Sequence, residues 1–364
     1  MTQLYNKNIF WYVSLPLARP AIVAGLALVC MEVVSDFGTV EYFALETLTL
    51  GIFNVWIGMN NINAAAQIST FTFIFILLLL LVEIKSRAGK RFNDTSSRQT
   101  NKKSKFITGI EASFCIVGCL IPVSLGFFIP VLILFSNAIT SLDFHNFREI
   151  LKIFSNTLII SLCGAFCIII VSTTVACTAY FSGKKYLRTI ANFSASGYAF
   201  PGTMLAIGIL VFVGVVDRAL DILSNDNMNL FLSGTMFMLL FAYIVKFQAV
   251  GYGAVLSGLT KTSPNLVWAS RTLGLSFQRT IARITIPLIK KSIIAGGVLA
   301  FVDIMKELPI TLLLRPFDFE TLATFTYQFA HDELMGQASV PALLIILVGL
   351  IPVIFLNKIL RTSI

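Results

Sequence analysis

The sequence is poor in charged residues and in histidine. Asp, Glu, Lys and Arg make up 12% of the 364 residues, against about 25% in ordinary soluble domains, and only two histidines occur. The six cysteines all fall in apolar stretches, so no His/Cys group has the spacing of a zinc site. A phosphate-binding Gly-x4-Gly-Lys-Ser/Thr loop and a Ser/His/Asp constellation are also missing. We therefore expect no enzyme activity in this chain, no ATP hydrolysis of its own and no cofactor, and the sequence leaves metal binding undecided.

Apolar residues dominate the chain instead. They make up 57% of it, with 32 Phe and a mean hydropathy of +0.86, as in integral membrane proteins. The formal net charge is +9, but the basic residues gather in short loops between apolar stretches. This pattern predicts membrane lipid as a partner and gives no reason to expect nucleic acid.

Eight apolar stretches are long enough to cross a bilayer, whose core of about 30 Å takes roughly 20 helical residues. They cover residues 18–38, 64–84, 108–139, 156–181, 189–216, 230–250, 289–312 and 338–357. Basic residues concentrate in every second loop, above all in 85–105, and acidic residues in the loops between. Because Lys and Arg favour the cytoplasmic side, the loops at 85–105 and 252–291 are predicted to be cytoplasmic.

Two stretches of the chain are copies of one another at an offset of 271 residues, so that Pro16 recurs as Pro287. The residues after each proline match in type at several positions, and both copies end in paired acids: Glu32 with Asp36, and Asp303 with Glu307. An internal repeat in a membrane protein usually means two halves packed around a pathway.

The repeat divides the chain into three parts. Residues 1–84 are predicted to be the C-terminal remnant of a first repeat with two spans, and 85–105 a flexible, basic linker. Residues 106–364 are predicted to be a complete second repeat of six spans. The first repeat would then lack its first four spans, as in a truncated or split gene product; the alternative is true divergence of a shorter protein.

The paired acids are unusual because an ionisable residue inside a span costs about 2.5–3.5 kcal/mol on insertion scales. Each pair is spaced four residues apart and shares a helix face. If pseudo-twofold symmetry relates the repeats, the four carboxylates converge near a translocation path. Alternatively, Asp36 and Glu307 sit at helix ends at the outer membrane boundary, and Lys306 or Arg315 pairs with an acid.

The cytoplasmic stretch 252–291 is long for a membrane loop. Leu266, Ala269, Leu273 and Phe277 lie on one face of a predicted helix, and Gly274 marks a turn after it. Such a helix, held out from a membrane domain, is suited to docking a soluble partner. Lying flat on lipid is the alternative, and the residues alone do not decide between them.

The same loop resembles the EAA loop of permease subunits of binding-protein-dependent ABC importers. The pattern of that family is Glu-Ala-Ala, three residues, Gly, nine residues, Ile-x-Leu-Pro. The chain matches it, with the correct gaps, at Ala269, Gly274, Ile284 and Pro287, and departs from it at Trp268, Ser270 and Ile286. The resemblance implies a coupling helix seated in a groove of a separate ATPase. The implied docking residues are Trp268, Ala269, Ser270, Gly274, Ile284 and Pro287, with Pro16 from the first copy.

Further segments resemble one branch of that family, the fused two-repeat permeases for ferric iron. They are Leu15–Gly25, Asp36–Glu41, Phe200–Gly208, Lys306–Pro316 and Glu320–Thr324. The resemblance implies an all-α, multi-pass protein of the bacterial inner membrane with the MetI-like permease fold. It also implies an ABC ATPase dimer and a periplasmic substrate-binding protein as partners, and a second chain could supply the missing helices.

We therefore expect a permease subunit that carries ferric iron, an oxygen-seeking hard cation, past the four carboxylates. Sulfate, thiamine or a phosphonate-like anion is the alternative cargo within the family. An ion-coupled secondary transporter would also show repeats and membrane acids but would not need the loop motif. A non-transporting fragment is the remaining alternative.

Overall fold

The computed structural model describes residues 10–88, 108–141, 147–224 and 232–361, and the regular structure in these ranges is helical throughout. Six segments are long and apolar enough to cross a membrane: Ile62–Leu81, Ala112–Thr140, Arg148–Phe181, Gly202–Leu223, Met236–Lys261 and Met335–Lys358. They belong to α5 (Ile62–Ala88), α6 with η3 and α7 (Ile110–Val123, Ser124–Phe128, Ile129–Thr140), α8 (Phe147–Phe181), α10 (Gly202–Ser224), α11 (Met236–Lys261) and α17 (Met335–Arg361). The predicted all-α membrane architecture is confirmed.

The two other predicted spans are also helices, α2 (Leu15–Ser35) and α14 (Ile286–Met305). Helix α14 is outside the six because Lys290, Lys291 and Asp303 interrupt its apolar composition. Helix α14 packs against α8, α11 and α17, so much of its surface faces protein rather than lipid.

The predicted span 189–216 is wrong in its boundaries. The chain there forms a short helix α9 (Lys185–Ser194), a 3-10 turn η5 (Gly197–Ala199) and then the long helix α10. Pro201, which lacks a backbone N–H, stands directly before the first residue of α10, where that missing donor leaves no hydrogen bond unmade.

The predicted span 230–250 is displaced in a similar way, because α11 begins at Met236 and continues to Lys261. Residues 252–261 are therefore helical rather than part of the predicted loop. Tyr252, Val255 and Leu259 follow a helical spacing and are buried against α8 and α14, which extends the helix beyond the expected boundary.

The centre of the fold is the packing of α8, α11 and α14 against one another. Small residues bring these helices close: a Cβ on Gly251 would lie 2.6 Å from the Ser172 hydroxyl, and one on Gly258 would lie 2.7 Å from the Ser292 hydroxyl. Because lipid tails are as apolar as the side chains on a membrane helix, exclusion from water does not drive such helices together, and close van der Waals packing between them does.

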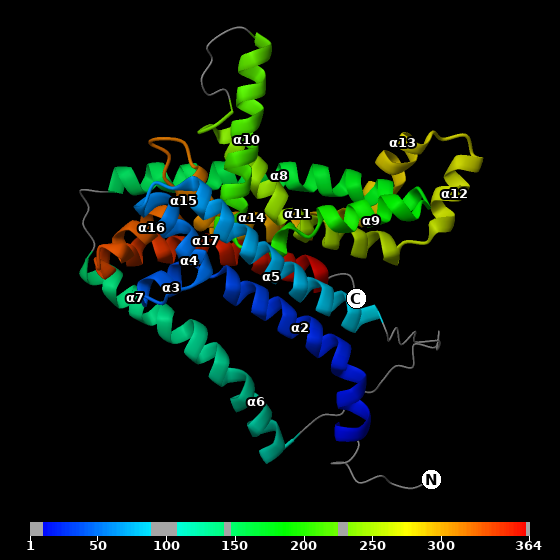
Figure 1. Cartoon of the computed structure of the whole chain (residues 1–364). Coiled ribbons are helices and arrows are strands. Elements are labelled where there is room, and N and C mark those ends of the chain that lie inside the picture. Colours follow the sequence, from blue (N-terminus) through cyan, green and yellow to red (C-terminus); the bar gives the residue numbers. More distant parts are fainter. Residues whose placement is uncertain (1–9, 89–107, 142–146, 225–231, 362–364) are drawn as a thin grey trace.

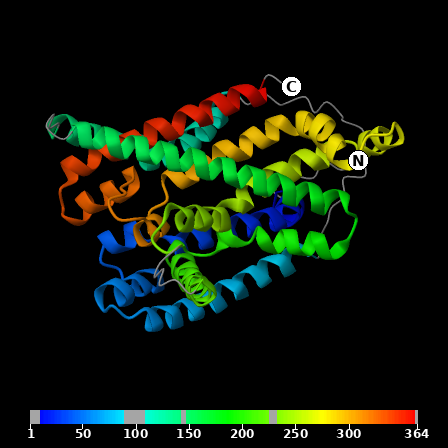
Figure 2. The ribbon, with the colours of Figure 1, turned by 90° about the horizontal axis from the view of Figure 1, so that it is seen from above.

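Figure 1 shows α8, α11, α14 and α17 with their helix axes roughly aligned. The inner end, predicted to be cytoplasmic, carries α12 (Pro264–Thr272), α13 (Phe277–Thr280) and the π turn η6 (Ile281–Thr285). The outer end carries α3 (Gly38–Tyr42), α4 (Leu48–Phe53), η2 (Asn54–Gly58), α15 (Pro309–Leu314) and α16 (Leu322–His331). Helix α10 stands across the bundle and is seen end-on in Figure 2.

The order of elements repeats with the sequence offset of 271 residues. The π turn η1 (Phe10–Ser14) leads into α2 and then α3, as η6 leads into α14 and then α15. Pro16 and Pro287 each stand in the first turn of their helix, where a missing N–H costs nothing. The division of the chain at 84 and 105 stays a prediction, and most of 85–105 lies outside the described residues.

Candidate functional site

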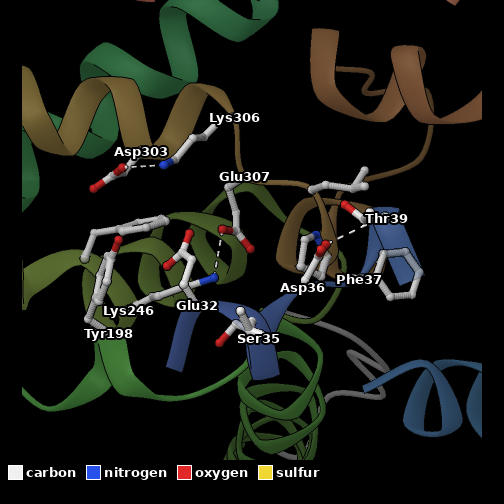
Figure 3. A pocket seen from close by; sticks show the side chains of 15 residues that line it. Glu32, Ser35, Asp36, Phe37, Thr39, Tyr198, Lys246, Asp303, Lys306 and Glu307 are labelled. Carbon is white, nitrogen blue, oxygen red and sulfur yellow. Dashed lines mark hydrogen bonds and ion pairs between the residues drawn. The ribbon is translucent and has the colours of Figure 1, made fainter. Parts of the chain in front are cut away.

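The two repeated helices, α2 and α14, end beside one another at a cavity of about 480 Å³ (Figure 3). The acidic, basic and phenolic side chains that line it are Glu32, Asp36, Tyr198, Lys246, Asp303, Lys306 and Glu307. All four acids predicted from the sequence therefore meet at one place, although they come from positions about 270 residues apart. Their role in transport stays a prediction.

Asp36 and Glu307 hold equivalent positions in the two copies, and each accepts a hydrogen bond from the backbone N–H three residues later. The Oδ1 of Asp36 accepts a hydrogen bond from the N–H of Thr39 at 3.3 Å, and the Oε1 of Glu307 accepts one from the N–H of Ile310 at 3.3 Å. Each carboxylate thus satisfies a free N–H at the start of a short helix, α3 or α15, and its negative charge is favourable there. These two acids do sit at helix ends, as the alternative proposed, and they also line the cavity.

Lys246, which the sequence reasoning missed, is the buried partner of Glu307. Its Nζ lies 2.8 Å from Glu307 Oε2, and the two side chains are only 10% and 8% exposed. A buried ion pair of this kind is stable only when the remaining polar atoms are also satisfied, and Glu307 meets this condition through Ile310. A lone lysine within the apolar helix α11 is itself a signal, because such residues are costly in a membrane.

Glycine at position 202 makes room for this pair. A Cβ there would lie 2.8 Å from Glu307 Oε1 and 2.8 Å from the ring of Pro309. Any side chain larger than hydrogen would push the carboxylate away from its position between Lys246 and the start of α15. The Pro201–Gly202 pair therefore serves both the helix break and the ion pair.

Lys306, the other lysine that lines the cavity, pairs with Asp303. Lys306 Nζ lies 3.1 Å from Asp303 Oδ1, one helical turn away, and is half exposed. Arg315, the other base that the sequence offered as a partner, pairs instead with Glu320 outside the cavity. Glu32 remains exposed on the cavity side of α2, where Figure 3 shows it below Glu307.

Tyr198 is brought to the cavity by the turn η5. A Cβ on Gly197 would overlap the carbonyl oxygen of Val245, so η5 rests directly on the backbone of α11. This contact places Tyr198 and Lys246 on adjacent elements facing the same space (Figure 3). The break between α9 and α10 therefore helps to form the cavity.

The carboxylates do not form a chelating cluster. Within the described ranges, no group of three or more His, Cys, Asp or Glu side chains lies close enough to hold a metal ion. Two of the four acids are instead paired with lysines. The four carboxylates therefore line the cavity as separate groups.

The inner end carries the predicted docking loop, folded as a helix, a turn and a helix. Gly274 has a φ of +88° between α12 and α13, a conformation that favours glycine. Ser270 is buried and donates to Val267 O at 2.8 Å and to the Thr280 hydroxyl at 3.0 Å, which ties α12 to α13.

Most of the apolar residues of α12 and its turn are exposed, although Val267 is buried. Leu266, Trp268 and Leu273 are 47%, 59% and 84% exposed, and Ala269 and Gly274 are exposed beside them. Ser270 and the half-buried Ile284 instead face the protein, so their contribution to docking is to hold the loop in shape. Pro16 is half-buried at the equivalent place in the first copy.

A contact at the outer end joins the two copies. The Tyr327 hydroxyl on α16 lies 2.6 Å from Glu41 Oε1 on α3, and His331 Nδ1 lies 3.6 Å from the same oxygen. Burial, and then the hydrogen bond and the charge of Glu41, raise the pKa of Tyr327 well above its ordinary value of 10.0. The phenol therefore stays protonated and donates to the carboxylate.

The family described as "Binding-protein-dependent transport system inner membrane component" matches residues 168–364, more than half of the chain. The chain belongs to this family. It is thus a multi-pass inner-membrane permease of a transport system, a class that is not enzymatic and that works with a binding protein. The sequence-based resemblance is confirmed, and the family differs from the ion-coupled secondary transporters that the sequence left open.

Two curated relatives of this permease have been found. A protein of Haemophilus influenzae named "Fe(3+)-transport system permease protein FbpB 2" is 25% identical over 96% of the chain, which spans 67% of that protein. A protein of Clostridium pasteurianum named "Probable transport system permease protein NifC" is 27% identical over 48% of the chain, and the match spans 59% of that protein.

Solved structures with a similar fold include two of a bacterial ABC transporter for the acidic polysaccharide alginate, one of them bound to its periplasmic protein. They match 70% of this permease with TM-scores of 0.56 and 0.55 at 18% identity. At that identity the likeness supports the fold and carries no information on cargo.

Proposed function

We propose that this chain is the permease subunit of an ABC importer that carries ferric iron across the inner membrane. A periplasmic binding protein delivers the iron, and a separate ATPase dimer supplies the free energy. The observation that carries the proposal is the meeting of Glu32, Asp36, Asp303 and Glu307 at one cavity between the two repeated helices. Ferric iron is a hard cation that prefers oxygen ligands of this kind.

The named function of the Haemophilus relative supports ferric iron as the cargo, because its match extends over 96% of this chain. The cavity supports a cation in particular. Its lining carries four carboxylates against two lysines, and each lysine lies beside one of these acids, so the charge of the lining is negative on balance.

The exposed residues of α12 support docking to an ATPase. Leu266 and Trp268 on α12 and Leu273 just after it are exposed apolar side chains at the inner end, and a soluble partner with an apolar groove could cover them. Gly274 and Ser270 hold this surface in one conformation, and a loop held rigid can transmit motion to α14, which it adjoins through η6.

The transport cycle follows from these two parts. ATP binding in the partner dimer moves the loop around Gly274, and the motion tilts α14 relative to α2. Because the acids lie where these two helices end, the tilt opens the cavity toward one side of the membrane and closes it toward the other. The ion is handed between separate carboxylates, each of which binds it weakly enough to release it.

Uptake of radiolabelled ferric iron tests the proposal. Cells that lack this gene are compared with the same cells carrying the restored gene, in the presence and absence of an energy source. Restored, energy-dependent uptake is the expected result, and excess sulfate or thiamine should not compete with it. Equal uptake with and without the gene, with the protein present in the membrane, would contradict iron as the cargo.

A further inference from the structure

The cavity contains positive charge where a cation pathway would be expected to exclude it. Lys246 and Lys306 share its wall with the four acids. Lys306 is half exposed and neighbours its partner on the same helix, so its pairing is weak. Lys246 differs because it reaches from α11 to Glu307 in the link between α14 and α15, and its side chain is 10% exposed. Its position therefore needs a separate explanation.

The ion pair removes Glu307 from the set of available ligands. Glu307 Oε2 is held by Lys246 Nζ at 2.8 Å, and Oε1 accepts from the N–H of Ile310 at 3.3 Å. Both oxygens are thus engaged. Glu32 and Glu307 lie within electrostatic range of Asp303, so an unpaired Glu307 would bring a third carboxylate to the same region.

A third carboxylate would harm transport of a trivalent cation. Several carboxylates that converge on one hard cation bind it tightly, and tight binding slows release. The described residues avoid this outcome in the arrangement that the ion pair holds: with Glu307 tethered to Lys246, no three His, Cys, Asp or Glu side chains are close enough together to chelate. The charge of Lys246 and its position beside Glu307 together explain how that carboxylate is kept from joining the others around one ion.

We infer that Lys246 is a tethered counter-ion that keeps Glu307 from completing a trap for the cargo ion, and so sets how weakly the pathway binds a trivalent cation. Lys246 is in this sense a positioning residue that acts through Glu307. The inference rests on the proposed function, because it assumes a cation cargo. It also makes a separate claim, which concerns how tightly a trivalent cation binds to the chain in the absence of ATP hydrolysis and transport.

Terbium luminescence measures that claim directly. Tb³⁺ is a trivalent, oxygen-seeking ion whose emission is excited through a nearby phenol, and Tyr198 lines the cavity. The purified full-length chain in detergent is titrated with Tb³⁺ as wild type and as Lys246→Met. We expect the variant to bind Tb³⁺ at least tenfold more tightly. Tyr198→Phe in the variant background should remove the emission and thereby place the ion in this cavity.

Three further variants separate the effect of removing the lysine charge from the effect of disturbing the local structure. Lys246→Arg keeps the charge and should bind Tb³⁺ as weakly as wild type, and Lys246→Met/Glu307→Gln should lose the gained affinity. Lys246→Gln keeps a hydrogen-bond donor without the charge, and it repeats the test if the methionine variant does not accumulate. Equal Tb³⁺ affinity in wild type and the charge-removed variants, or a gain that survives Glu307→Gln, would overturn the inference.

The experiment distinguishes failure of this inference from failure of the proposed function. Tb³⁺ binding needs neither ATPase nor transport, so it can show the tethered counter-ion even if cells take up no ferric iron. Conversely, normal iron uptake by wild type combined with unchanged Tb³⁺ affinity in Lys246→Met would leave the permease assignment standing and remove the role given to Lys246.

Discussion

Replacing Gly197 by alanine is a severe test of how the site is built. A Cβ at this position would overlap the Val245 carbonyl oxygen and lie 2.9 Å from its carbon and 3.3 Å from the Cα of Lys246. These are backbone atoms and cannot rotate away. To restore ordinary carbon contacts of about 3.5–4.0 Å, η5 and α11 must separate by roughly 1 Å.

The expected cost of this separation lies at the upper end of the range for overpacking, about 3 kcal/mol. Unfolding entropy is roughly 2.1 cal/mol/K per residue, so over the 364 residues this cost lowers the melting midpoint by about 4 °C. Because Tyr198 and Lys246 lie on the two sides of the contact, the same shift distorts the cavity, and we expect iron uptake to fall with stability.

The assay is thermal denaturation of the purified chain in detergent, with Gly208→Ala on α10 as the matched control. A Cβ on Gly208 meets nothing within 4 Å, and alanine is favoured over glycine in a helix by about 0.5–1 kcal/mol. The control should therefore melt at or slightly above the wild-type midpoint. If Gly197→Ala melts within about 1 °C of this control, the direct contact between η5 and α11 does not exist.

Two further predictions concern the ends of the molecule. Leu273→Ser should weaken binding of the ATPase subunit at least tenfold in a pull-down titration, because burying a leucine is worth about 1.5–3 kcal/mol and the Leu273 side chain is 84% exposed without the partner. The matched control is Leu334→Ser at the outer end, which should leave binding of the ATPase subunit unchanged. Tyr327 should ionise well above pH 10 in an ultraviolet titration, and Glu41→Gln should lower its pKa, because the carboxylate is one cause of the upward shift. Since the folded-state pKa is raised, the stability from this phenol is complete below about pH 10 and is lost as the pH rises above it; a Tyr327 that titrates near pH 10 would contradict the buried contact.

Hydropathy and the internal repeat predicted much of the fold, because a membrane requires long apolar helices and a duplicated sequence folds twice in the same way. The repeat in particular predicted that Glu32, Asp36, Asp303 and Glu307 meet. The sequence did not predict where helices break. Within 189–216 the change from α9 to α10 is marked by single residues, Ser194, Ser196, Gly197 and Pro201, which the apolar content of the whole stretch does not register.

Residues that depend on contacts between distant elements were missed. Lys246 belongs to the site because Glu307, in the link between α14 and α15, is 2.8 Å away, and no local pattern encodes that distance. Ser270 was predicted to face the ATPase, but its hydroxyl bonds to Thr280 and is buried. The loop motif predicted that Ser270 was near something functional and no pattern singled out Lys246, and only the packed structure shows which way each side chain faces.

Uptake of ferric iron by pocket variants tests the central claim most directly. Cells carrying Glu32→Gln/Asp303→Asn are compared with wild type and with Glu333→Gln, which removes an exposed acid at the outer end. Membrane content and ATPase binding are measured in each strain. The account predicts at least a tenfold loss of uptake in the pocket variant alone, with both other quantities unchanged. Wild-type uptake by that variant would show that iron does not pass between α2 and α14.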